Sequence, residues 1–132
     1  MRAFLSALLG GLILASTTFA NAQDIDWQKV DATLGRKPAI SGDVHRYGFP
    51  RSDLKVTLDG VSIAPALALG GWVAFKPAHD RVMAMGGSVL LENAINPGMS
   101  KLLDRCHQGT AVYNQLLPHT PCAFFLPDGG YC

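Results

Sequence analysis

The chain has 132 residues, with 11 Lys and Arg against 10 Asp and Glu and a net charge of +1. This length fits one domain, large enough to bury about two thirds of the surface that its unfolded chain exposes. Charges of both signs are interspersed without a basic stripe, which argues against nucleic-acid binding and against electrostatic attraction to anionic membranes.

Residues 1–22 have the three parts of a secretory signal peptide. The second residue is basic, an apolar run covers residues 3–15, and Ala20 and Ala22 are the small residues that signal peptidase requires before the cut. The run is shorter than the ~20 apolar residues of a membrane-spanning helix, so an uncleaved anchor is the less favoured alternative. We expect cleavage before Gln23, no membrane span in the mature protein, and a periplasmic or secreted location.

A short helix is predicted at the start of the mature chain, over Asp24–Leu34. Its apolar residues recur at helical spacing, Asp24 or Asp26 can cap its N-terminus, and Gly35 ends it. The next segment, Ala39–Pro50, is punctuated by Gly and Pro and is predicted to be extended.

The middle of the chain predicts short antiparallel strands. Leu54–Leu58 and Val61–Ile63 alternate apolar and polar residues on either side of Asp59-Gly60. This pattern favours a β-hairpin, because Asp-Gly accepts the positive φ angles of the turn. Further strands are expected at Leu67–Lys76, Arg81–Met85 and Val89–Leu91, the last two separated by Gly86-Gly87.

A second helix is predicted over Glu92–His107. We expect Asn93 to cap it, Pro97 to lie in its first turn, and Gly109 to follow its end. One face of this helix is apolar and is formed by Ile95, Met99, Leu102, Leu103 and Cys106.

The C-terminal residues return to strand character. Thr110–Leu117 and Ala123–Leu126 are predicted strands, and Pro127–Gly130 is predicted to be a turn. The sum is an α+β fold with a short N-terminal helix, a mostly antiparallel β-meander, one amphipathic helix packed on the sheet, and further short strands.

Three cysteines, Cys106, Cys122 and Cys132, leave the disulfide pairing open. An oxidising compartment would permit a disulfide, and Cys122 with Cys132 would close a short terminal loop. The alternative is three unpaired thiols with Cys106 buried as a small apolar residue.

Asp43, His45 and Tyr47 alternate in the first extended segment and would share one face of a strand. A carboxylate and an imidazole on one face could bind a divalent metal ion or transfer a proton. The alternative is a solvated polar face of a half-buried sheet. Of the other three histidines, His79 is interpreted as a turn residue, His107 as a residue of the last helical turn and His119 as a loop residue.

Three blocks of residues occur together in a familiar order. They are Ser41–Leu54, then Leu58–Val61 through Pro65 to Trp72–Phe75, and Asn96-Pro97 with Met99 and Leu102. In these blocks the chain resembles the LppY/LpqO family of bacterial exported proteins, a domain of unknown function. The likeness extends over about Asp24–Leu117, and the family supplies no activity to carry over.

The resemblance implies a strand with a His-x-His pair whose two imidazoles could chelate one metal ion. Tyr113 and Gln115 stand at these two positions here, and the family's later histidines and C-terminal segment are absent. We therefore expect the family site to be degraded.

Three interpretations of function remain open. The favoured one is an exported, non-catalytic binding module, since the sequence has no nucleophile elbow, P-loop or dinucleotide fingerprint. The second is a metal-binding or hydrolytic domain that uses Asp43 and His45. The third is a truncated, non-functional remnant. The sequence indicates no particular ligand, partner or oligomeric state.

Overall fold

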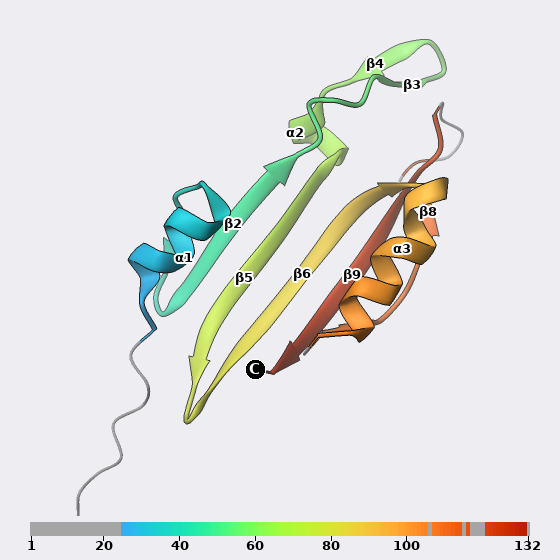
Figure 1. The fold of residues 1–132 in the computed structure, drawn as a ribbon. Coiled ribbons are helices and arrows are strands. Elements are labelled where there is room, and N and C mark those ends of the chain that lie inside the picture. The colour runs from blue at the N-terminus through green and yellow to red at the C-terminus, as the bar shows by residue number, and fades with distance from the viewer. Residues whose placement is uncertain (1–24, 106, 115, 117–120, 132) are drawn as a thin grey trace, which may run out of the picture.

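The computed structural model describes residues 25–131 except 106, 115 and 117–120. These residues form an α+β fold, as predicted, with a seven-stranded antiparallel sheet and a separate two-stranded sheet (Figure 1). The signal peptide predicted at residues 1–22 lies outside the described residues. None of the described helices is long and apolar enough to cross a membrane.

The large sheet has a simple spatial order. Its strands are β1 (Ala39–Ser41), β2 (Val44–Pro50), β5 (Gly70–Ala78), β6 (Arg81–Leu91), β9 (Ala123–Tyr131) and β7 (Gln108–Gly109), and β8 (Tyr113–Asn114) also pairs with β9. The two long central strands, β6 and β9, are paired over nine residues.

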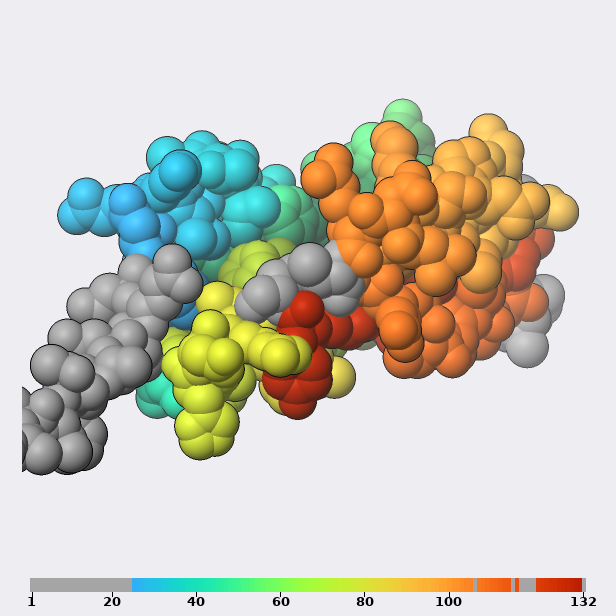
Figure 2. All heavy atoms as spheres, turned by 60° about the horizontal axis from the view of Figure 1, so that its bottom comes forward, coloured from blue at the N-terminus to red at the C-terminus, as the bar shows by residue number. Residues whose placement is uncertain are grey.

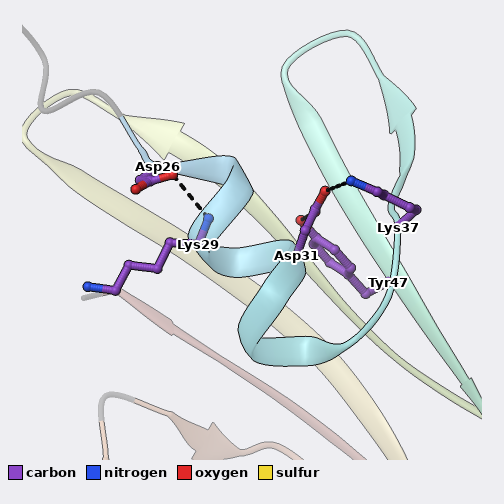
Figure 3. A network of polar contacts seen from close by, with 5 residues as sticks. All are labelled: Asp26, Lys29, Asp31, Lys37 and Tyr47. Atoms are coloured by element: carbon purple, nitrogen blue, oxygen red, sulfur yellow. Dashed lines mark hydrogen bonds and ion pairs between the residues drawn. The ribbon is translucent and has the colours of Figure 1, made fainter.

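The first helix, α1 (Trp27–Leu34), follows the sequence closely. The Asp26 side chain accepts a hydrogen bond from the Lys29 backbone N–H at 3.0 Å, and Gly35 ends the helix at a left-handed φ of 62°. Both ends are therefore set by the local chemistry that predicted them. The helix packs along β2, where the Tyr47 hydroxyl donates to Asp31 at 2.8 Å (Figure 3).

The hairpin prediction is also confirmed. β3 (Val56–Leu58) and β4 (Val61–Ile63) are joined by Asp59 at φ 49° and Gly60 at φ 80°, the left-handed conformations that this turn requires. The hairpin lies beyond the ends of β2 and β5 (Figure 1). It contributes two residues to a cluster of buried apolar side chains, which consists of Val56, Ile63, Leu69, Val89 and Ala123.

The strand predicted from Leu67 begins later than expected. Residues Pro65–Ala68 form the short helix α2, and β5 starts at Gly70. Pro65 occupies the start of the helix, where its fixed φ and its missing N–H cost little. Leu67 and Ala68 belong to this helical turn, whereas the rest of the predicted strand, from Gly70 to Lys76, lies on β5.

The break predicted at Gly86-Gly87 is wrong, because β6 continues through both residues. These glycines permit close packing. A methyl group at Gly86 would lie 2.8 Å from the Trp72 carbonyl oxygen, and one at Gly87 would overlap the Phe125 ring. The two glycines leave room for Trp72 and Phe125, which are distant from them in the sequence.

The turn predicted at Pro127–Gly130 is also wrong, since β9 runs without interruption to Tyr131. The Pro127 carbonyl accepts a hydrogen bond from the Thr110 backbone N–H at 2.9 Å, on the side of β9 away from β6. The N–H that proline lacks would point to that same side. Pro127 therefore removes no bond between β9 and β6.

The second helix, α3, covers Glu92–Leu103 and stops before the predicted end at His107. β6 runs directly into it, so the N-cap is Leu91 rather than Asn93, with no side-chain capping bond. Pro97 lies inside the helix, beyond the first turn, on its exposed side.

The apolar face of α3 is only partly as predicted. Ile95, Met99 and Leu102 are half-buried, but Leu103 is 66% exposed. The helix approaches the sheet at Gly98, where a methyl group would lie 3.0 Å from Leu90. Packing of α3 on the sheet is confirmed, since the helix lies over β9 (Figure 1).

Of the strand predicted at Thr110–Leu117, the described residues form only β8, and β7 lies just before the predicted range. β7 and β8 have two residues each, and residues 110–112 between them belong to no strand. Leu117 lies outside the described residues.

Candidate binding groove

Both longer helices, α1 and α3, cover one face of the large sheet. The register places Tyr47, Val73, Gly86 and Asp128 in one row across β2, β5, β6 and β9. Directly paired residues point to the same face. This face, called the helix face below, therefore includes Tyr47 beneath α1 at one side and Asp128 near α3 at the other. Figure 2 shows the blue residues of α1 and the orange residues of α3 on the same side of the molecule.

A groove of about 300 Å³ lies beside α3 on the helix face, and we call it the α3 groove. Strands β2, β5, β6 and β9 contribute to it, as do the last turn of α3 and the residues that follow. Its lining consists of Phe49, Gly71, Trp72, Val73, Gly87, Ser88, Leu102, Arg105, His107 and Asp128.

The glycines of this region bring backbone atoms to the surface of the sheet. A methyl group at Gly71 would lie 3.2 Å from the Gly87 carbonyl oxygen. One at Gly86 would lie 3.3 Å from a carboxylate oxygen of Asp128. The sheet can therefore hold a buried carboxylate beside the groove because no side chain occupies position 86.

His107 and Asp128 form the polar centre of the groove. His107 Nδ1 lies 2.8 Å from Asp128 Oδ1, and the side chains are 18% and 7% exposed. A carboxylate can only accept, so Nδ1 carries the proton, and Nε2 of the neutral ring then offers a lone pair. The pairing of Gly109 with Asp128, between β7 and β9, holds the two residues in place.

This arrangement can accept a hydrogen bond or take up a proton, but it does not form a Ser-His-Asp triad. A triad needs the histidine between the serine and the carboxylate. Ser88 lies on β6 and is paired with Leu126, two residues from Asp128 along β9. His107 precedes β7, which pairs with the other edge of β9. The carboxylate thus lies between the two other side chains.

The metal candidates Asp43 and His45 have different neighbours. Asp43 lies in the turn before β2 rather than on the strand, and its carboxylate pairs with Lys76 at 3.2 Å. The His45 ring stacks on Trp27, with the ring centroids 3.5 Å apart and the planes 5° from parallel. His45 Nδ1 is buried and has no hydrogen-bond partner among the described residues. Nowhere among the described residues do three or more His, Cys, Asp or Glu side chains form a group that could hold a metal ion.

The alternative interpretation of this segment, a solvated polar face of the sheet, is wrong. Tyr47 is fully buried, and both it and His45 lie on the helix face, covered by α1. The reason is that α1 folds back along β2 and supplies Asp31 and Trp27 as their partners.

The contact between α1 and β2 also shifts two pKa values. The hydrogen bond from Lys37, and then the one from Tyr47, hold the pKa of Asp31 below its usual value. Burial, followed by the hydrogen bond to Asp31, raises the pKa of Tyr47 to about 12. Figure 3 shows Asp31 between Lys37 and Tyr47.

The positions expected for the degraded His-x-His pair are only partly described. Tyr113 lies on β8, with its ring centroid 5.6 Å from that of Phe125. Gln115, His119, Cys106 and Cys132 lie outside the described residues, so the disulfide alternatives stay untested. His79 lies in the β5–β6 turn, as interpreted, at φ 56°.

Sequence reasoning missed the His107–Asp128 pair. The sequence predicts a helix end at His107 and a turn at Asp128. The two residues are 21 positions apart, and only the pairing of β7 with β9 joins them. No local motif could have identified this contact.

Comparison with known proteins identifies a family. A family model described as "Domain of Unknown Function (DUF1259)" matches residues 28–129, which include every residue of the α3 groove. No curated protein and no solved structure matches the chain.

Proposed function

We propose that this chain, which belongs to the family described as "Domain of Unknown Function (DUF1259)", is an exported, non-catalytic binding domain for a small molecule. The α3 groove is its binding site. The observation that carries the proposal is the buried His107–Asp128 pair, which lies in a groove of about 300 Å³ whose other walls are mainly apolar. Small-molecule sites typically combine an apolar cavity with a few positioned polar groups.

Binding is favoured over catalysis by the arrangement of the polar side chains. The groove has one histidine, and its serine is separated from that histidine by Asp128. A positioned histidine alone can orient a ligand by hydrogen bonding, and this requires no nucleophile.

Export and the LppY/LpqO likeness are part of the same proposal, supported by residues 1–22 and by the sequence blocks described above. Expression of the full chain in a bacterial host, followed by cell fractionation and intact-mass measurement, tests export. We expect a periplasmic or secreted product that begins at Gln23. A cytoplasmic product that keeps residues 1–22 would contradict it.

The binding proposal is tested by screening the purified protein against a library of small fragments, with ligand-observed NMR as the readout. Ser88→Leu places a larger apolar side chain in the groove and is expected to abolish binding of the hits. Ser62→Leu, on the exposed surface of β4, is the matched control and should leave binding unchanged. Thermal melts establish that both variants are folded.

Two results would overturn the proposal. One is a folded protein that binds no fragment. The other is a set of hits whose binding is the same in the wild type and in folded Ser88→Leu. His107→Asn gives a second check, and it changes the volume of the groove less than Ser88→Leu does. An asparagine amide can still donate to Asp128 from the place of Nδ1.

A further inference from the structure

Arg105 brings a positive charge to the rim of the α3 groove. It follows the C-cap of α3, Asp104, and its backbone N–H bonds to the Leu102 carbonyl at 3.0 Å. The turn that ends the helix thus fixes the point from which the side chain extends. Arg105 is exposed, and its guanidinium forms no ion pair within the described part of the chain.

The carboxylate of the groove is, by contrast, buried and hydrogen-bonded. Asp128 is 7% exposed, and its Oδ1 lies 2.8 Å from His107 Nδ1. Burial limits the access of a cationic ligand to this carboxylate. An anionic ligand meets an accessible guanidinium, which binds carboxylates through two parallel hydrogen bonds. The accessible charge of the groove is therefore the positive one of Arg105, which favours an anion.

The remaining walls match an apolar group. Phe49 and Val73 belong to the helix face on β2 and β5, and Leu102 belongs to the last turn of α3. All three side chains are half-buried, so a ligand that covers them removes further apolar surface from water.

We infer that the α3 groove binds a small organic carboxylate with an apolar body. The carboxylate pairs with Arg105, and the apolar body lies against Val73 and Leu102. The inference rests on the proposed function and narrows it to one class of ligand. A monocarboxylate fits the groove better than a phosphate dianion. Arg105 is the one side chain of the lining that always carries a positive charge. The carboxylate of Asp128 repels a second negative charge on the ligand.

The test uses isothermal titration calorimetry with phenylalkanoates, from phenylacetate to phenylhexanoate, and with the amide and amine of each. The amide keeps the shape of the acid and removes its charge, and the amine reverses the charge. Each compound is titrated into the wild type, Arg105→Gln and Lys101→Gln. Lys101→Gln is the matched control, since it removes one positive charge from the last turn of α3, at an exposed position outside the groove.

We expect at least one carboxylate to bind about tenfold more tightly than its amide, and Arg105→Gln to remove that preference. Lys101→Gln should retain it. Equal binding of acid and amide, or loss of the preference in both variants, would overturn the carboxylate inference and leave the proposed groove intact. Preferred binding of the amines would overturn it as well. If no compound binds while the fragment library gives hits, the ligand class alone is wrong; if the library also gives none, the proposed function fails.

Discussion

The ring of Phe125 lies against the Cα of Gly87, so that any side chain at position 87 would overlap the ring. Gly87 is paired with Trp72 on β5, and Trp72 is paired in turn with Gly48 on β2. The two glycines therefore flank the same tryptophan. They differ in surroundings, because a methyl group at Gly48 would meet no atom within 4 Å.

This difference predicts opposite tolerance to alanine. Gly87→Ala should destabilise the protein by about 1–3 kcal/mol, since Phe125 must leave its position or the strands must shift. Gly48→Ala should change the free energy of unfolding by less than about 1 kcal/mol. Urea denaturation of the two variants measures both values. Equal effects would show that Phe125 does not pack on Gly87 in solution.

Tyr47 predicts a loss of stability at high pH. Its folded-state pKa of about 12 lies above the ordinary tyrosine value of about 10, so its contribution is fully present below pH 10 and is lost as the pH rises through 12. The free energy of unfolding should fall by about 2 kcal/mol between pH 10 and pH 12 from this group. Denaturation at a series of pH values provides the measurement.

Tyr47→Phe is the control for that prediction. It removes the hydroxyl that donates to Asp31 and should cost about 1 kcal/mol near neutral pH. It should also reduce the decline between pH 10 and pH 12. If the free energy of unfolding declines equally in the variant, other tyrosines or lysines cause the decline, and the burial of Tyr47 does not.

The His107–Asp128 pair makes a prediction about stability that is independent of any ligand. His107→Ala leaves the buried Asp128 carboxylate without its partner and should cost about 1–3 kcal/mol. His107→Asn should cost less, because its amide can still donate to the carboxylate. Thermal or urea denaturation compares the two variants. An alanine variant as stable as the asparagine variant would contradict the hydrogen bond.

The metal interpretation of Asp43 and His45 remains open to a direct measurement. Asp43 is paired with Lys76 and His45 is stacked on Trp27, so we expect the metal content of the purified protein to be unaffected by His45→Ala. Elemental analysis of both proteins measures it. One bound divalent ion per chain that is lost in His45→Ala would instead support the metal-binding alternative.

Local chemistry made part of the fold predictable. The Asp26 cap, the Gly35 helix end and the Asp59-Gly60 turn each depend on residues that are neighbours in the sequence, and all three appear as predicted. Such features are decided within one turn of chain, where the conformational preferences of Asp and Gly dominate.

Features that depend on distant partners were not predictable in this way. Gly86-Gly87 and Pro127–Gly130 have the composition of breaks, yet both lie within long strands. Whether a glycine interrupts a strand or admits a neighbour depends on that neighbour, here Phe125 and the carbonyl of Trp72. The candidate site follows the same rule, since sheet pairing brings together the separated residues His107 and Asp128.

The α3 groove is the central claim, and mapping of backbone amide shifts by NMR tests it most directly. Hits from the fragment screen are titrated into isotope-labelled protein. We expect the largest shifts at Val73, Ser88 and His107, which line the groove, and small shifts at Ala66 and Leu67 in the cavity beside α2. Shifts concentrated at α2, or spread over the sheet without a maximum at the groove, would contradict the account.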